Sequence, residues 1–382
     1  MLLERATDEF RIAGHAYPDF PILLWDDMTG CDPVNEFFRH HLLRGTIRSN
    51  RTWDGAGRAL YDYFSFLQAH ELEWNSTKQA GRKDLLAAYR DYSFQIAAHR
   101  ESTVRQRLSF LVAFYEYSQS AQLIEHLPFR LEMRRAAPRG DAFLGHIGRT
   151  DVGVRTADVV PRSKRGLPQF LSRTQTQALL AAATNPHHRM LIQMAVQSGL
   201  RRAELATLPV DIVVNPQGIS KRNIRIELDP AAGGGQKTKG SKRRSIWISK
   251  SLMTDLWQYV AHHRSERAGV ADNTHNNLFL NVAGEQYAED GKSINRIVST
   301  VGATAGIRVH LHMLRHTYAT HTLVELQRRR AENRLEPLVF LQRQLGHASI
   351  ATTMVYLHLI NELADDAVLQ YQDELDGLRP EL

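Results

Sequence analysis

The chain has 382 residues, which at roughly 150 residues per domain predicts two domains. Hydrophobic residues make up 43% of it and charged residues 23%, an ordinary globular composition that can form a core in each domain. The single cysteine, Cys31, excludes an intramolecular disulfide and a cysteine-based zinc finger. The formal net charge of +7 favours nucleic acid as a partner without requiring it.

The sequence contains no apolar run of the roughly 18 residues that a membrane span needs. Its first residues, MLLERATDEF, carry acids where a signal peptide has a basic flank and an apolar stretch. We therefore expect a cytoplasmic protein that has no membrane partner.

In chain order, residues 1–30 show no clear periodicity and are interpreted as an N-terminal extension. Residues 31–137 show helical spacing of apolar residues and predict a small domain of four or five helices. Thr52 and Thr103 are candidate N-caps within it. Arg51 and Arg105 lie beside the apolar faces and are candidate DNA-binding residues.

Residues 138–166 lose this periodicity, and their prolines, glycines and basic residues predict an exposed basic linker. A second domain is predicted over residues 167–382. It starts with helices over Ser172–Ala183 and His187–Gln197, the second of which ends at Gly199. Asn223–Leu228 and Ser245–Ile248 are interpreted as the strands of a hairpin, and helices follow from Ser251 onwards.

The positive charge is concentrated in part of the second domain. Sixteen lysines and arginines against four acids lie between Pro161 and Lys250, whereas Asn361–Leu382 holds seven acids and one arginine. This asymmetry indicates a phosphate-binding face and an element that avoids it, although a solvated surface with an acidic end gives the same pattern. The hairpin tip, GGGQKTKGSKRR, supplies these candidate DNA-binding residues: Lys237, Lys242, Arg243 and Arg244.

Two segments of the second domain place an arginine near a helix end or between histidines. In SGLRRAEL, Gly199 suits a helix terminus and Arg201 precedes Glu204 by three residues, a spacing that also describes an ordinary surface ion pair. In HMLRHTYATH, His312 and His316 have the spacing of zinc ligands. Met313 replaces the glutamate of a zincin, however, and Arg315 would repel a cation, so we expect no metal there.

Two further segments hold a lysine and a tyrosine. The hairpin tip is either a solvated turn or a loop that delivers a lysine to a phosphate. In LGHASIATTMVY, Gly346 breaks a helix, His347 follows it, and Tyr356 lies nine residues after the histidine. A lone tyrosine in such a helix is ordinarily a core residue.

Taken in order, these four segments resemble the tyrosine recombinase family, which includes phage integrases. The resemblance covers about Leu167–Ile360. It implies a mainly α fold, in which a helical core-binding domain and a mostly α catalytic domain with a small antiparallel β-hairpin form a clamp around DNA. By motif position it implies this catalytic set: Arg201, Lys239, His312, Arg315, His347 and Tyr356. Glu204 matches the acid that supports the first arginine.

The resemblance also implies a mechanism. Two arginines would neutralise the charge that develops on the non-bridging phosphate oxygens, so no metal or other cofactor is expected. His312 would act as the base for Tyr356, and His347 would donate a hydrogen bond to the phosphate. Lys239 would protonate the leaving 5′-oxygen, with Lys237 as the alternative. The product is a 3′-phosphotyrosyl linkage, whose energy allows religation without ATP.

The family likeness further predicts assembly. Apolar residues recur with helical spacing from Ile360 to Tyr371, which predicts an amphipathic helix at about 360–375. It either packs within its own chain or docks on a neighbouring protomer in a tetramer bound to double-stranded DNA with inverted-repeat core sites. The enzyme would then be associated with the nucleoid. Tyr318 and Tyr371 compete with Tyr356 as nucleophile, but both are better explained by packing.

The sequence leaves two other functions to consider, and it departs from the family pattern at one place. A non-catalytic DNA-binding accessory protein on the same fold predicts the loss of a catalytic residue, whereas all six positions are filled. A type IB topoisomerase shares the catalytic set but acts without synapsis. The apparent exchange helix indicates synapsis and therefore favours the recombinase. The interval from Arg315 to His347 is longer than in compact members of the family, because of the charged stretch ELQRRRAENRLEP.

Overall fold

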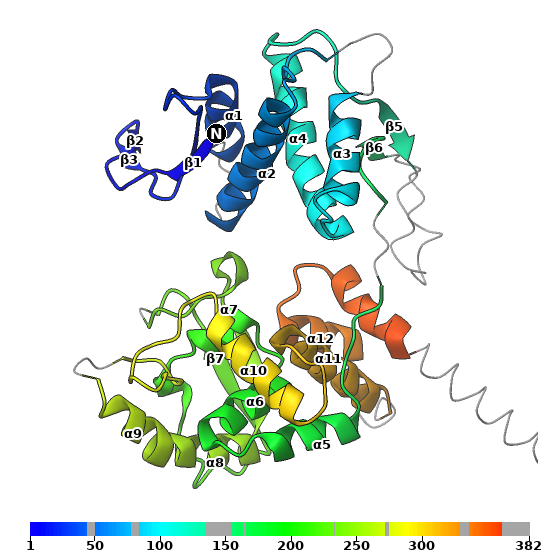
Figure 1. Cartoon of the computed structure of the whole chain (residues 1–382). Coiled ribbons are helices and arrows are strands. Elements are labelled where there is room, and N and C mark those ends of the chain that lie inside the picture. The colour runs from blue at the N-terminus through cyan, green and yellow to red at the C-terminus, as the bar shows by residue number, and fades with distance from the viewer. Residues whose placement is uncertain are drawn as a thin grey trace, which may run out of the picture. The chain divides into compact units, whose positions relative to one another are not determined.

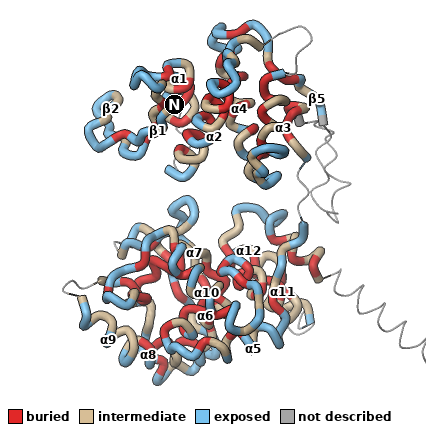
Figure 2. Tube along the Cα trace, viewed as in Figure 1, coloured by how far each residue is buried: buried red, intermediate tan, exposed pale blue. Residues whose placement is uncertain are grey.

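A computed structural model describes residues 1–43, 50–77, 84–134, 154–162, 166–232, 234–271, 275–328 and 336–360. The chain divides into two compact units, Met1–Arg165 and Gly166–Leu382 (Figure 1). Each unit has its own hydrophobic core, and buried residues line the inward faces of its elements (Figure 2). None of the helices in the described segments is long and apolar enough to cross a membrane.

The first unit is built on four helices. These are α1 (Asp32–Leu42), α2 (Asn50–Ala69), α3 (Leu85–Gln95) and α4 (Glu101–Ser120). Their inner faces are aromatic: Tyr63, Phe64 and Phe114 are all buried, and the Tyr63 and Tyr115 hydroxyls hydrogen-bond at 2.6 Å. The predicted N-caps, Thr52 and Thr103, are wrong, because α2 already includes Asn50 and the N-cap of α4 is Arg100. Glu101 instead places an acid in the first turn of α4, which complements the helix dipole.

Residues 1–30 belong to this unit and do not form a separate extension. Strand β1 (Leu2–Arg5) pairs antiparallel with β4 (Pro21–Leu24), and β2 (Arg11–Ile12) pairs with β3 (His15–Ala16). Phe20 and Leu23 are buried in the helical core. The side chain of Asn35 on α1 hydrogen-bonds both the N–H and the carbonyl of Leu23. Strands of two to four residues are too short to show an alternating pattern in the sequence.

Part of the segment predicted to be a linker is also ordered on the first unit. Strand β6 (Val154–Ala157) pairs antiparallel with β5 (Leu131–Arg134). Ala157, Val159 and Val160 are buried in the core of the unit. The stretches 135–153 and 163–165 of this region lie outside the described residues.

The second unit packs helices around a two-stranded antiparallel hairpin. Strand β7 (Asn223–Leu228) pairs with β8 (Arg244–Ser249), as the sequence predicts. The longer helices are α5 (Arg173–Ala182), α6 (Pro186–Ser198), α8 (Lys250–Tyr259), α10 (Lys292–Thr304), α11 (Leu311–Arg328) and α12 (Pro337–Leu345). Shorter turns are α7 (Arg202–Ala206), η1 (Val210–Ile212), η2 (Lys239–Ser241), η3 (Val260–Arg264) and α9 (Ser265–Ala268). Residues 350–360 are also helical.

Helix α6 lies at the centre of this unit, where it contacts α8, α11 and β8 (Figure 1). The predicted boundaries of the first two helices are confirmed: Ser172 caps α5 in a capping box, and α6 ends at Gly199. The fold is therefore mainly α with small antiparallel sheets, as expected. The predicted helix at about 360–375 lies, beyond Ile360, outside the described residues.

Candidate active site

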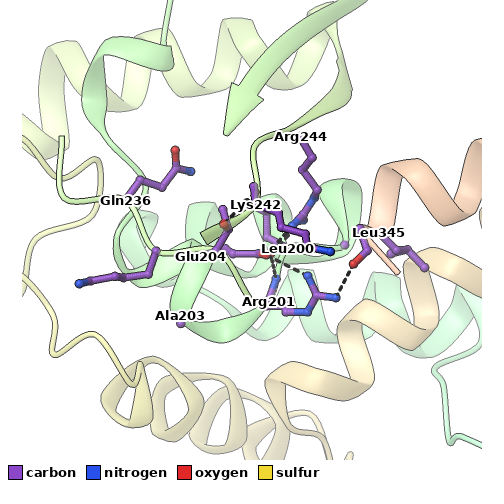
Figure 3. Close-up of polar contacts among 12 residues, drawn as sticks. Leu200, Arg201, Ala203, Glu204, Gln236, Lys242, Arg244 and Leu345 are labelled. Carbon is purple, nitrogen blue, oxygen red and sulfur yellow. Dashed lines mark hydrogen bonds and ion pairs between the residues drawn. The ribbon is translucent and has the colours of Figure 1, made fainter. Parts of the chain in front are cut away.

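Glu204 on α7 lies between two arginines (Figure 3). Its carboxylate accepts hydrogen bonds from the backbone N–H of Arg201 at 2.7 Å and from the Arg201 guanidinium at 3.0 Å. Arg244, the first residue of β8, pairs with both carboxylate oxygens, one of them at 2.9 Å. Glu204 is only 1% exposed. Burial raises the pKa of Glu204, but the hydrogen bonds and charge of Arg244, together with Arg201, outweigh burial and hold this pKa below its usual value.

Arg315 on α11 holds two chain segments together from the interior. Its guanidinium donates to the carbonyl of Gly199 at 2.6 Å and to that of Leu345 at 2.7 Å. Arg201 donates to the next carbonyl, Gly346, at 2.9 Å. Burial and then the charge of Arg201 lower the pKa of Arg315 to about 9, so its side chain stays cationic at neutral pH. The two arginines thereby fix the end of α6 against the end of α12.

Tyr356 lies inside this cluster, on the helix over 350–360. Its side chain is 1% exposed, and its hydroxyl is 2.9 Å from Nδ1 of His316 on α11. On the other side, the ring of His347 stacks parallel to the tyrosine ring, with centroids 6.3 Å apart and an interplanar angle of 8°. Burial raises the pKa of Tyr356, while the charges of Arg315 and Arg201 act in the opposite direction.

Burial and nearby positive charge favour the neutral form of the histidines His312, His316 and His347. Burial, and then the charge of Arg315, lowers the pKa of His347 to about 3 and also lowers that of His312. Burial, and then His312 and Arg315, lowers the pKa of His316 to about 4. Nδ1 of His347 lies 3.0 Å from the hydroxyl of the buried Thr353. The rings of His312 and His316 meet edge to face, with centroids 4.5 Å apart.

The two candidate lysines of the hairpin have different surroundings. Lys237 forms an ion pair with Glu289 at 3.3 Å, and its backbone N–H donates to Thr207. Lys239 is exposed and lines a cavity of about 1100 Å³, together with Arg201, Arg244 and His347. Of the two lysines, Lys239 is thus the one that shares the lining of this cavity.

A side chain of helix α12 is hydrogen-bonded to the hairpin. The amide of Gln344, which is buried, accepts from the N–H of Trp247 at 2.9 Å and donates to its carbonyl at 3.0 Å. This pairing covers the outer edge of β8, as a further strand would. It sets the position of His347, three residues later, relative to the hairpin that carries Lys239.

The residues expected to bind DNA are not equivalent. Lys242 is exposed at the cavity, and Arg243 is also exposed but pairs with Glu227 and Asp229. Arg244 differs from the expectation, because its side chain is only 10% exposed and its guanidinium is held by Glu204. In the first unit, Arg51 is exposed on α2, whereas Arg105 donates to the carbonyl of Pro161 at 3.0 Å and so ties the 154–162 segment to α4.

Two contacts of the site are not apparent from the sequence. His316 lies within its motif without an expected role, and it is the hydrogen-bond partner of Tyr356. Arg244 is expected to be a surface cation, and it is a partner of Glu204. The signal for His316 is its position directly after Arg315, one turn after His312 on the same helix face.

The fold and the residues gathered at the cavity define the class of protein, an enzyme that cleaves and rejoins DNA through a tyrosine. Residues 169–362 match the model of the phage integrase family. Because this match covers more than half of the chain, the chain belongs to that family of tyrosine recombinases.

Curated relatives agree with this membership, and solved structures share the fold. The chain is 27% identical over 329 residues to "Tyrosine recombinase XerC" of Azotobacter vinelandii, an alignment that covers 84% of this chain and 90% of the relative. A structure of the XerH site-specific recombinase bound to palindromic difH substrate superposes with a TM-score of 0.57 at 17% identity, covering 85% of this chain and 81% of that one. A Tn1549 transposon integrase in complex with circular intermediate DNA gives 0.56 at 18% identity, covering 85% and 94%.

Proposed function

We propose that this chain is a site-specific recombinase that cuts one DNA strand at a time and holds it as a 3′-phosphotyrosyl intermediate. The observation that carries this proposal is the surroundings of Tyr356. A buried phenol lies among His316, His347 and Arg315, and Arg201 and Lys239 line the adjoining cavity. Packing alone does not require cations and neutral histidines around a tyrosine.

The proposed reaction assigns each group a task. Arg201 and Arg315 would hold the two non-bridging oxygens of the scissile phosphate, with His347 donating a further hydrogen bond and His312 at the rim of the phosphate site. The Tyr356 oxygen would attack phosphorus and give its proton to a histidine. As the new O–P bond forms, the bond to the 5′-oxygen breaks, and that oxygen takes a proton from Lys239. Reversal of these steps with another strand's 5′-hydroxyl completes the exchange.

The arrangement of the substrate and the assembly are also part of the proposal. Double-stranded DNA with inverted-repeat core sites would be contacted by both units, and the palindromic substrate of XerH supports this symmetry. Four protomers would be joined by exchange of the segment at about 360–375. The reaction would serve the integration, excision, transposition or resolution of a mobile element, on DNA of the nucleoid in the cytoplasm.

Covalent capture from a random library tests the chemistry even when the DNA site has not been identified. Duplexes with a randomised core and a nick next to the cleavage point lose the short cleaved fragment, so the adduct accumulates. The wild-type chain should retain DNA through denaturing washes, and sequencing of that DNA should give an inverted repeat. Tyr356→Phe, which keeps the buried ring, should retain none.

Other results would support other functions. An adduct that persists in Tyr356→Phe would contradict the assignment of the nucleophile. DNA binding without any adduct would favour a non-catalytic accessory protein. An adduct accompanied by relaxation of supercoiled plasmid but no strand exchange would favour a type IB topoisomerase.

A further inference from the structure

We infer that His316 is a catalytic residue, the group that takes the proton of Tyr356 when the phenol attacks DNA. The inference rests on the proposed function and replaces His312 as the base. It is carried by a direct contact, because Nδ1 of His316 lies 2.9 Å from the Tyr356 hydroxyl. A general base must lie within about 2.6–3.2 Å of the group from which it takes a proton.

The direction of this hydrogen bond depends on the tautomer of the ring. His316 is surrounded by His310, His312 and Arg315 from α11 and its approach, by Tyr356 from the facing helix, and by His347 from the turn before that helix. Burial and these neighbours favour the neutral imidazole, which has one protonated nitrogen and one nitrogen with a free lone pair. We assign the lone pair to Nδ1, the nitrogen that contacts the phenol, so that the Tyr356 hydroxyl donates. In this tautomer the phenol is aligned for transfer of its proton to His316.

Helix geometry explains why His316 occupies this place and His312 does not. His312 precedes His316 by four residues and so lies on the same face of α11, one turn nearer the start of the helix. His312 is the more exposed of the two residues, whereas His316 is half-buried and contacts Tyr356. The two imidazoles meet edge to face, with centroids 4.5 Å apart. We therefore assign His312 to the phosphate and to the onward passage of the proton.

A bound phosphate supplies a negative charge near His316 that the free protein lacks. In the absence of DNA, burial and then His312 and Arg315 oppose a positive charge on His316. A phosphodiester held by Arg201 and Arg315 adds a negative charge to the cluster, which favours the protonated imidazole. The proton then leaves the Tyr356 oxygen for Nδ1 of His316, while the oxygen's electron pair forms the bond to phosphorus. In religation, the same imidazolium returns the proton to the departing phenolate.

The test is the pH profile of single-turnover cleavage on a nicked duplex, the one selected by covalent capture with the wild-type chain. In wild type the rate should be nearly flat between about pH 6.5 and about pH 8, because the base is neutral in this range and Arg315, whose pKa is about 9, is still cationic. In His316→Phe the rate at pH 7 should fall by about 10²- to 10⁴-fold, the usual contribution of a general base. It should then recover about tenfold per pH unit, because attack would depend on the small fraction of Tyr356 that ionises unaided.

Further variants separate proton transfer from positioning. In His316→Asn the side-chain amide can still hydrogen-bond the phenol but cannot accept its proton, so this variant should show the same loss and the same slope as His316→Phe. His321→Asn is the matched control, since His321 lies on the same helix and donates to the Leu171 carbonyl at 2.8 Å. It should lower thermal stability without changing the slope.

Each other outcome overturns the inference. Near wild-type cleavage by His316→Asn would make His316 a positioning residue only. Faster cleavage by His316→Phe would mean that the hydrogen bond restrains Tyr356 and slows its attack. A pH slope that appears in His312→Asn but not in His316→Asn would return the base to His312. Absence of an adduct with the wild-type chain would overturn the proposed function together with this inference, whereas a wild-type adduct with flat variant profiles overturns the inference alone.

Discussion

At the scale of single residues, the two lysines of the hairpin make the general acid testable. We expect Lys239→Ala to slow cleavage of an ordinary phosphodiester by about 10²- to 10⁴-fold, because the 5′-alkoxide would leave without a proton. A substrate with sulfur in place of the bridging 5′-oxygen should restore the rate, since a thiolate is a far better leaving group and needs no acid. Rates of adduct formation on the two substrates provide the measurement.

Lys237→Ala is the matched control for this experiment. Lys237 lies two residues away on the same hairpin and is paired with Glu289. The variant should cleave both substrates at the wild-type ratio. A sulfur rescue seen with Lys237→Ala and not with Lys239→Ala would move the acid to Lys237.

Glu204 gives a prediction about stability and pH. Its neutralisation in Glu204→Gln leaves Arg201 and Arg244 without their buried counter-charge, which should lower the free energy of unfolding by about 3–5 kcal/mol at pH 7. Because the folded-state pKa of Glu204 is lowered, the stability it contributes is present above the ordinary value of 4.5 and is lost as the pH falls through the folded pKa. Urea unfolding of both chains should therefore show a difference that shrinks below about pH 4.5. A difference that stays constant down to about pH 3 would contradict this.

The residue scale also shows what sequence can and cannot foresee. The order of the motifs leads directly to Arg201, Arg315 and Tyr356, which the fold brings together from three separate segments. Sequence spacing does not tell which of two histidines one turn apart faces a tyrosine forty residues later. That depends on how the helix over 350–360 packs against α11. The burial of Arg244 is equally hidden, because it arises from contacts with Glu204 on α7 and with Gly346 after α12, and not from local composition.

At the scale of elements, the position of the Arg315 side chain depends on the C-terminal end of α6. Gly199 has φ +64°, and a Cβ there would lie 2.5 Å from the Tyr318 ring. Its carbonyl also accepts from Arg315. Gly199→Ala should cost about 1–2 kcal/mol for the left-handed backbone and about 1–3 kcal/mol more for overpacking. We expect a lower melting temperature together with slower adduct formation, because Arg315 loses its anchor.

Gly218 separates the two causes. It also has a positive φ, +83°, but a Cβ there would have nothing within 4 Å. Gly218→Ala should therefore show only the backbone cost, and its adduct formation should be unchanged. Equal losses of melting temperature and of adduct formation in the two variants would mean that the contact of Gly199 with Tyr318 affects neither stability nor cleavage.

Elements are predictable where their sequence signals are local. The caps Ser172 and Gly199 and the alternation of Asn223–Leu228 correctly define α5, α6 and β7. The short strands of residues 1–30 and β6 escape prediction, because each has four residues or fewer. Strands β1 and β4 are held against the helices of the first unit, and Ala157 of β6 is buried in its core. Tertiary packing, and not local propensity, forms such strands.

At the scale of the whole molecule, the proposed reaction would bring two units with separate cores to one DNA. The second unit holds the cavity with Lys239 and Lys242, and the first presents Arg51 on the exposed side of α2. Neither unit depends on the other for its buried apolar residues. Cooperation between them therefore requires that DNA contact both, which the salt dependence of binding can reveal.

Each phosphate that a protein neutralises steepens the fall of log K with log salt by about 0.9. If both units contact the same duplex, Arg51→Ala and Lys242→Ala should each make the slope shallower by about 0.9, and the double variant by about 1.8. Lys292, whose charge is paired with Asp290 at 3.0 Å, is the matched control, and Lys292→Ala should leave the slope unchanged. Titration of the captured duplex between roughly 50 and roughly 300 mM salt provides the slopes. A slope that responds to Lys242→Ala but not to Arg51→Ala would show that the α2 surface carrying Arg51 does not contact phosphate, and DNA would then have to reach the first unit by another face or not at all.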